Sequence, residues 1–156
     1  MAYEVKVRDV PAQKVMSVRF VTSLSGMSGD MGAAFQEIWD CIEKSGIKFA
    51  GEFFAVYHDE NFNPDKIDVE CCISVPEFLP ESGRVKAREV EGGLMAATTH
   101  KGSYDTLEGA YTAILEWIGK NPYTPLFRMR DVYLNSPDEV PPEELLTEVL
   151  WPVARK

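Results

Sequence analysis

A six-residue segment near the start of this chain recurs in nearly the same form eighty residues later. Residues 5–10 read VKVRDV and residues 85–90 read VKAREV. The similarity continues, at offsets of 76 and 78, through two further pairs of segments, 33–46 with 109–122 and 68–75 with 146–153. The offset changes only where loops are expected. We therefore read the chain as two copies of one unit, and this duplication limits the folds open to it.

Each copy has the periodicity of one amphipathic helix followed by alternating strands. The helical segments have apolar or aromatic residues at i, i+4, i+7 and i+11, namely Met31, Phe35, Ile38 and Ile42 in the first and Leu107, Tyr111, Ile114 and Ile118 in the second. This spacing predicts one buried helix stripe per copy. Asp105 and Glu108 have the spacing of a capping box at the start of the second helix.

The predicted fold class is α+β, with a duplicated β-α-β-β repeat and a further short strand opening each copy. The repeats span about residues 3–75 and 84–153. Because one copy alone is too small to cover its sheet face, we expect a single domain over residues 1–156. We expect pseudo-two-fold symmetry, a curved antiparallel sheet of about eight strands, two main helices and a central groove.

Composition excludes several function classes. The chain is 45% hydrophobic and 26% charged, as in soluble globular proteins, and its net charge of −9 argues against direct nucleic-acid binding. It has no apolar run long enough to span a membrane and no secretory signal, and its three cysteines form no metal-binding spacing. We expect a cytoplasmic protein. The serine-hydrolase, zinc-protease and nucleotide-binding motifs are missing, and we expect no cofactor and no metal.

Residues that differ between the copies are the better candidates for function, because shared residues are expected to serve the fold. Asp131 stands where the first copy has Ala55, and alternation puts it on one strand face with Tyr133. Aspartate is unfavourable inside strands. One interpretation is an exposed face on which Asp131 pairs with a basic neighbour. The other is an anionic floor of an apolar pocket, which would neutralise a cation or accept a proton.

Aromatic residues are plentiful enough to line such a pocket. The candidates for ligand contact are Asp131, Tyr133, Tyr57, Tyr104, Phe20, Phe53, Trp39, Trp117 and His100. Tyr57 and Tyr133 are shared between the copies and would either line a cleft or pack. Phe35 and Tyr111 lie in the helix stripes and are expected to pack. Glu70 and Glu148 are also shared, so we interpret them as structural or pairing groups.

Several motifs together resemble the GyrI-like (gyrase-inhibitor-like) small-molecule-binding domain, which is also the effector-binding module of AraC-type and MerR-type regulators. They are His100-x-Gly102-x-Tyr104, Leu107-x₃-Tyr111 through Trp117-Ile118, Asp131-x-Tyr133, and Thr147-Glu148-x₃-Pro152-Val153. The resemblance implies a groove that binds hydrophobic, often cationic, aromatic compounds. It also implies a key acidic residue at Asp131, usually Glu in the family, with Tyr133 two positions later. Aspartate shortens the reach by one methylene.

Three functions follow as hypotheses. The first is a stand-alone protein that binds hydrophobic, cationic aromatic compounds, as in drug or toxin resistance. The second, which some family members imply, is a hydrolase of cyclopropane-bearing toxins in which Asp131 and Tyr133 are catalytic. The third is a protein-interaction module whose partner is gyrase or a separate regulator.

Overall fold

The computed structural model describes residues 3–47, 51–59, 61 and 63–156. Its contacts divide the chain into two compact units. Unit 1 consists of Met1–Val10 and Gly93–Lys156, and unit 2 of Pro11–Gly92. No helix within the described ranges has both the length and the apolarity that crossing a bilayer requires.

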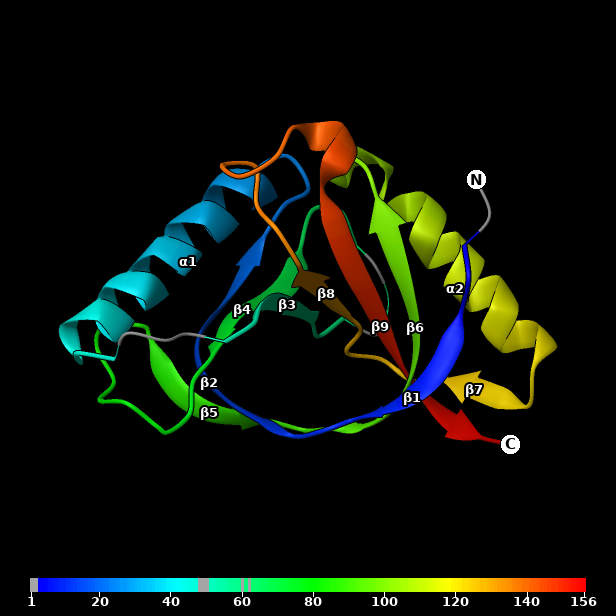
Figure 1. The fold of residues 1–156 in the computed structure, drawn as a ribbon, viewed down its shortest axis with the longest axis horizontal. Helices are drawn as coiled ribbons and strands as arrows, with labels where there is room; N and C mark the ends of the chain where they lie inside the picture. Colours follow the sequence, from blue (N-terminus) through cyan, green and yellow to red (C-terminus); the bar gives the residue numbers. More distant parts are fainter. Residues whose placement is uncertain (1–2, 48–50, 60, 62) are drawn as a thin grey trace. The chain divides into compact units, whose positions relative to one another are not determined.

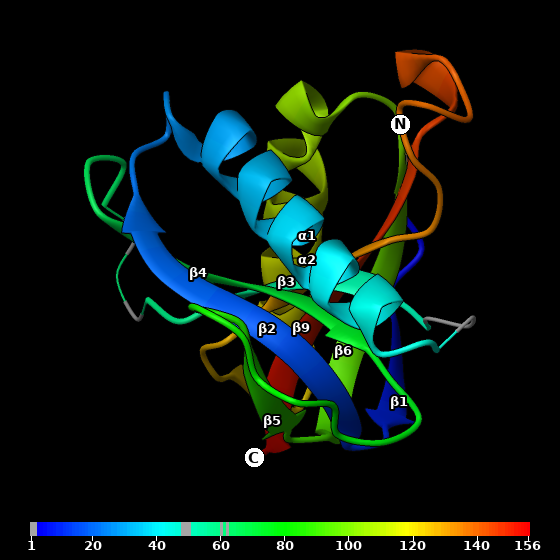
Figure 2. The ribbon, with the colours of Figure 1, turned by 90° about the vertical axis from the view of Figure 1, so that its left-hand side faces the viewer.

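Unit 2 is a four-stranded antiparallel sheet with one helix on it. The strand order is β3-β4-β2-β5. The helix packs on β2 and β4, as Figure 2 shows, and buries Met31, Ile38 and Ile42 of the predicted stripe, whereas Phe35 is only half-buried. The elements are β2 (Gln13–Thr22), α1 (Met27–Lys44), β3 (Phe53–Tyr57), β4 (Ile67–Ser74) and β5 (Lys86–Val90).

Unit 1 repeats this arrangement with the strand order β8-β9-β6-β1 (Figure 1). A further short strand, β7, pairs with β9, and helix α2 packs on β6, β7 and β9. The elements are β1 (Lys6–Val10), β6 (Gly93–Lys101), the 3-10 turn η1 (Tyr104–Thr106), α2 (Glu108–Lys120), β7 (Tyr123–Pro125), β8 (Arg130–Tyr133), the 3-10 turn η2 (Pro142–Glu144) and β9 (Leu146–Arg155).

The strand registers reproduce the offsets that the sequence repeat predicts. Ala55 pairs with Cys71 in unit 2, and Asp131 pairs with Val149 in unit 1, at offsets of 76 and 78. Ser17 pairs with Cys72, and Ala97 pairs with Leu150, at offsets of 80 and 78. A one-residue slip would move every side chain to the opposite face, so the matched registers show that the copies align residue by residue.

The first strand of each copy lies in the sheet of the other copy. Strand β1 pairs with β6 of the second copy, and β5 pairs with β2 of the first. The arginines of the repeated hexapeptides have equivalent partners after this exchange. Arg8 contacts Glu148 at 2.8 Å, and Arg88 contacts Glu70 at 2.6 Å. The compact units therefore differ from the sequence repeats by one strand each.

The start of α2 differs from the sequence expectation. The turn η1 precedes the helix, and the capping position of α2 is Leu107, with no side-chain cap, so the predicted capping box of Asp105 and Glu108 is wrong. Before this turn Gly102 has φ +136, a conformation that favours glycine. The chain reverses at Gly102 instead of entering the helix directly from β6.

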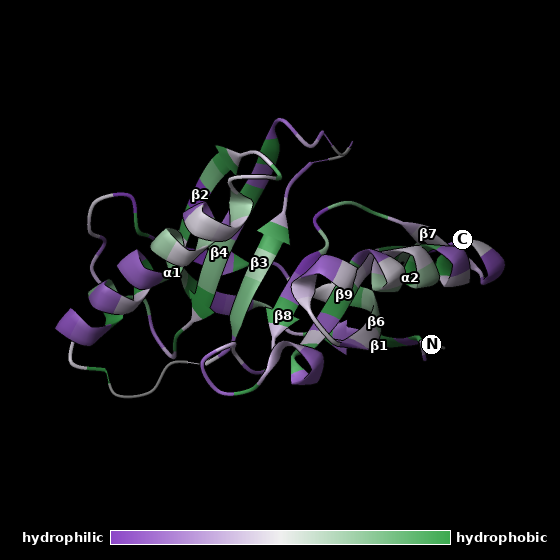
Figure 3. Cartoon of the chain, turned by 90° about the horizontal axis from the view of Figure 1, so that it is seen from above, coloured by the Kyte–Doolittle hydropathy of each residue, from purple (hydrophilic) through white to green (hydrophobic). Residues whose placement is uncertain are grey.

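The predicted fold class is confirmed. In the described part of the chain the two units contribute four antiparallel strands each to these ladders, plus β7, and one long helix each. The strands β3 and β4 are coloured mostly hydrophobic in Figure 3, whereas α1 also has hydrophilic residues. This pattern matches a helix that buries one stripe and a sheet that is buried on at least one face.

Candidate ligand-binding site

Asp131 is the most unusual buried group of unit 1. It lies inside β8, opposite Val149 of β9, and is only 1% exposed. The predicted alternative of an exposed Asp131 on a solvated face does not hold. Removing a carboxylate from water is costly unless hydrogen bonds compensate it. Arg130 comes directly before it and, by strand alternation, points to the opposite face.

One compensating hydrogen bond comes from helix α2. The hydroxyl of Tyr111 donates to Oδ2 of Asp131 at 2.5 Å. Tyr111 belongs to the helix stripe and was expected only to pack. Its counterpart in the first copy is Phe35, which has no hydroxyl, and the counterpart of Asp131 is Ala55. The donor and the acceptor therefore occur in the same copy, and both are replaced in the other. This joint difference between the copies is the sequence feature that could have revealed the hydrogen bond.

Two more tyrosines extend the arrangement toward solvent. Tyr133 lies two residues after Asp131 on the same strand, and its ring meets the ring of Tyr104 edge to face, with centroids 5.6 Å apart. Tyr104 belongs to η1 and is 38% exposed. Its partial burial raises the pKa of its phenol. We call Asp131, Tyr111, Tyr133 and Tyr104 the acidic tyrosine cluster.

This cluster combines a buried carboxylate with aromatic rings. A carboxylate attracts positive charge, and the faces of tyrosine rings attract it as well, by about 0.5–2 kcal/mol per ring. Phenol hydroxyls can also donate hydrogen bonds or orient a water molecule. The chemistry of the cluster suits an apolar cation better than an anion.

Two of the predicted contact residues lie elsewhere in unit 1. Trp117 is near the other end of α2, where it stacks on Tyr123 of β7 with centroids 5.8 Å apart. His100 is buried at the end of β6 and is hydrogen-bonded to Tyr3 and Thr106. Both residues have intramolecular partners in the unit.

The remaining predicted contact residues belong to unit 2. Phe53 lies between Phe35 and Trp39 of α1, with ring centroids 5.9 and 6.1 Å from theirs. Phe20 of β2 lies under the guanidinium of Arg84. Tyr57, the last of these predicted contact residues, is half-buried at the end of β3. This part of unit 2 is aromatic, and Ala55 stands where unit 1 has its carboxylate.

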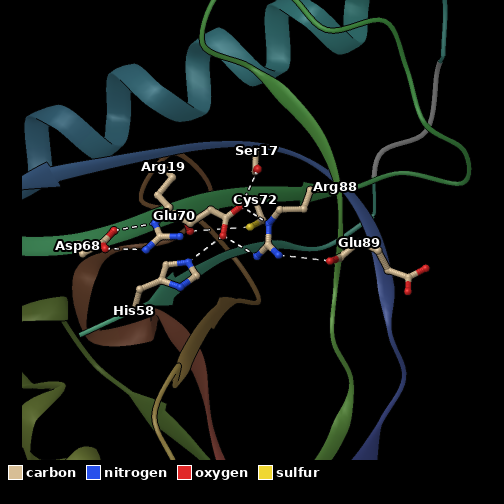
Figure 4. Close-up of polar contacts among 8 residues, drawn as sticks. All are labelled: Ser17, Arg19, His58, Asp68, Glu70, Cys72, Arg88 and Glu89. Atoms are coloured by element: carbon tan, nitrogen blue, oxygen red, sulfur yellow. Dashed lines mark hydrogen bonds and ion pairs between the residues drawn. The ribbon is translucent and has the colours of Figure 1, made fainter. Parts of the chain in front are cut away.

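Unit 2 has a different buried carboxylate, Glu70 of β4 (Figure 4). Arg88 of β5 holds both oxygens, at 2.6 and 2.7 Å. Ser17 of β2 donates to Oε2 at 2.7 Å, and Nε2 of His58 lies 2.8 Å from Oε1. Burial acts to raise the pKa of Glu70, but the hydrogen bonds from His58, Arg88 and Ser17 prevail and lower it to about 2. Glu70 thus joins four segments of unit 2 as a structural group.

The described residues give no sign of metal or thiol chemistry. No group of three or more possible metal ligands occurs among them. The three cysteines are buried and form no disulfide, and burial raises the pKa of Cys71 to about 12. A thiol with such a pKa is a poor nucleophile, since the reactive form is the thiolate.

Comparison with solved structures finds close likeness of fold at low sequence identity. The EcmrR–DNA complex in EcmrR-RPo matches 99% of this chain with a TM-score of 0.86 and 24% identity, and this chain spans 58% of that one. The EcmrR C-terminal domain matches over the full length of both chains, with a TM-score of 0.84 and 23% identity.

Two more distant structures bear names that concern function. A hydrolase from Listeria innocua matches 97% of this chain and 92% of its own, with a TM-score of 0.75 and 14% identity. SAV2435, solved bound to tetraphenylphosphonium, matches 99% of this chain and 94% of its own, with a TM-score of 0.66 and 12% identity.

The sequence itself matches no curated protein. It does match the sequence model of the GyrI-like small molecule binding domain, over residues 3–154. That match covers nearly the whole chain and both units. The chain therefore belongs to the family of GyrI-like small-molecule-binding domains.

Proposed function

We propose that this protein binds hydrophobic cations, with the acidic tyrosine cluster of unit 1 as the cation site. The observation that carries the proposal is the buried carboxylate of Asp131, held by the hydroxyl of Tyr111 at 2.5 Å. Keeping such a charge buried costs stability, and a function in binding positive charge would explain why the chain retains it.

The family and one relative support the chemical class of the ligand. The family binds small molecules. The structure of SAV2435 holds tetraphenylphosphonium, a cation whose charge is surrounded by four phenyl rings. A delocalised cation of this kind loses little hydration energy when it is buried. It can therefore reach a carboxylate between tyrosine rings at a low desolvation cost.

The direct test is calorimetric titration with tetraphenylphosphonium and with triphenylphosphine oxide as a neutral aromatic control. The wild-type protein should bind the cation and should bind the neutral compound at least about tenfold more weakly, a difference of about 1.4 kcal/mol. The variant Asp131→Asn keeps the size of the side chain and removes its charge, so it should lose this preference.

Equal affinity of the wild-type protein for both compounds, or an unchanged preference in Asp131→Asn, would contradict the proposal. Asp105→Asn is the matched control, since Asp105 is an exposed aspartate of the same unit that lies beside Tyr104. It should bind tetraphenylphosphonium like the wild-type protein.

A second candidate function is hydrolysis of electrophilic, cyclopropane-bearing compounds. The Asp131–Tyr111 hydrogen bond favours it, because a carboxylate can activate a water molecule while a phenol stabilises developing negative charge. Tyr133 or Tyr104 would orient that water. Incubation with such a compound, followed by mass spectrometry, separates the two functions. Multiple turnovers that Asp131→Asn abolishes support the hydrolase, whereas binding without product rejects it.

A further inference from the structure

We propose that Tyr3 and His100 are positioning residues that hold Tyr104 in place at the cation site and thereby set its affinity. This inference rests on the proposed function, since it concerns the same site. Neither residue belongs to the acidic tyrosine cluster. They act through a chain of hydrogen bonds that starts in the N-terminal segment and ends at η1.

His100 is the centre of this chain and is only 2% exposed. Its Nδ1 lies 2.8 Å from the hydroxyl of Tyr3, whose ring also stacks on the imidazole. Its Nε2 lies 2.9 Å from Oγ1 of Thr106 and 3.2 Å from the carbonyl oxygen of Ser103. A buried imidazole with partners on both nitrogens is fixed in tautomer and in orientation.

The hydroxyl of Thr106 shows which nitrogen of His100 carries the proton. Oγ1 of Thr106 donates to the carbonyl oxygen of Ser103 at 2.9 Å, so it accepts from Nε2–H of His100. In the neutral imidazole Nδ1 then accepts from Tyr3. The hydrogen bonds therefore run in one direction, from Tyr3 through His100 and Thr106 to Ser103. Tyr104 lies between the last two residues, within the loop that these bonds close.

The segment that holds Tyr3 is itself fixed against β6 and α2. The carbonyl oxygen of Glu4 accepts a hydrogen bond from Thr98 of β6 at 2.8 Å. Gly109 of α2 makes room for Tyr3, because a methyl group there would lie 3.3 Å from the tyrosine hydroxyl. Figure 1 shows the N-terminal segment running beside α2. These contacts fix the position of Tyr3, so that its hydroxyl can hold His100.

The position of Tyr104 has a consequence for binding. It is the most exposed member of the acidic tyrosine cluster, and its one ring contact among the described residues is the edge-to-face contact with Tyr133. A 3-10 turn of three residues does not hold its own side chains firmly, since its hydrogen bonds are poorly aligned. The bonds of His100 and Thr106 supply the constraint, and a ring already in place binds a ligand at a lower entropic cost.

The test combines Tyr3→Phe, which keeps the stacked ring, with Thr106→Val, which keeps the side-chain shape. Each variant should bind tetraphenylphosphonium about 3- to 10-fold more weakly than the wild-type protein, chiefly through faster dissociation. Neither should weaken binding further when Tyr104 is already replaced by alanine, because the effect passes through that ring. Effects that persist undiminished in the Tyr104→Ala background would overturn the inference.

Tyr123→Phe is the matched control, since Tyr123 is another stacked tyrosine of unit 1. This variant should bind tetraphenylphosphonium with the affinity of the wild-type protein. Amide hydrogen exchange without any ligand provides an independent measurement. Tyr3→Phe should speed exchange at Thr106 and Leu107, and unchanged exchange there would overturn the inference. If the wild-type protein fails to bind the cation but exchange does accelerate, the proposed function fails while the positioning role of Tyr3 stands.

Discussion

Glu70 and Glu148 occupy equivalent positions in the two copies, yet their surroundings differ. Each pairs with the arginine in the hexapeptide of the other copy, Glu70 with Arg88 and Glu148 with Arg8. Only Glu70 also has Ser17 and His58 as partners, and the equivalent positions in unit 1 hold Ala97 and Leu134. The side chain of Glu70 is 2% exposed, against 21% for Glu148. The equivalent carboxylate thus lies at the centre of a buried hydrogen-bond network in unit 2 and forms a partly solvated ion pair in unit 1.

This difference predicts unequal costs of neutralising the two glutamates at neutral pH. Glu70→Gln leaves the partly exposed Arg88 without its counter-charge and weakens the hydrogen bonds to a buried carboxylate, so it should lower the free energy of unfolding by about 2–4 kcal/mol. Glu148→Gln removes a partly solvated pair and should cost about 1 kcal/mol or less. Denaturant unfolding at pH 7 measures both. Equal costs would contradict the structural contrast.

The lowered pKa of Glu70 predicts a specific acid sensitivity. The pKa is about 2 in the folded protein, against an ordinary value of 4.5. Since the folded state binds the proton less readily than the unfolded state, the stabilisation is fully present above pH 4.5. It is lost as the pH falls toward 2, and amounts to about 3 kcal/mol.

Unfolding titrations between pH 6 and 2 test this sensitivity. The stability of the wild-type protein should fall more steeply with decreasing pH than that of Glu70→Gln, which has no carboxylate to protonate at this position. Parallel curves would show that Glu70 titrates normally.

Individual residues also show how far the sequence could predict the site. The mismatch of Asp131 with Ala55 singled out the carboxylate, because charge inside a strand is exceptional. The hydrogen bond of Tyr111 was not predicted, because a tyrosine in an apolar helix stripe packs in most proteins. Its hydroxyl acquires a role only through Asp131 of β8, and helix periodicity does not reveal that the two side chains meet.

At the scale of elements, the turn between β6 and α2 depends on a glycine. Gly102 has φ +136, and a methyl group there would lie 3.5 Å from both His100 and Thr106. Gly102→Ala should therefore destabilise the protein by about 1–3 kcal/mol. Gly32→Ala, at an open position inside α1, should stabilise it by about 0.5–1 kcal/mol. Thermal unfolding of both variants measures these opposite changes in stability. A gain of stability in Gly102→Ala would contradict the positive φ of Gly102.

The helices and ladders followed from the sequence better than the connections did. Helix stripes and strand alternation are local, and the copies confirmed each other, so the offsets predicted which residues of the two units are equivalent. The short strand β7, the turn η1 and the exchange of β1 and β5 could not be inferred in this way. They depend on which surface each segment meets, and two equal copies offer equal local patterns.

At the scale of the whole molecule, the duplication did not produce two equal sites. Unit 1 has Asp131 and Tyr111, while unit 2 has Ala55 and Phe35 at these positions. The proposal therefore predicts one cation bound per chain. Calorimetric titration with tetraphenylphosphonium should give a stoichiometry of one, and two equivalent cations per chain would contradict the assignment of the site to unit 1.

The most direct measurement of the central claim is an NMR experiment on the complex with tetraphenylphosphonium. With tyrosine rings labelled selectively, intermolecular nuclear Overhauser effects should connect the phenyl protons of the ligand to Tyr104 and Tyr133. These effects should disappear in Asp131→Asn under the same conditions. Effects that reach only aromatic residues of unit 2, or that persist unchanged in Asp131→Asn, would contradict the account.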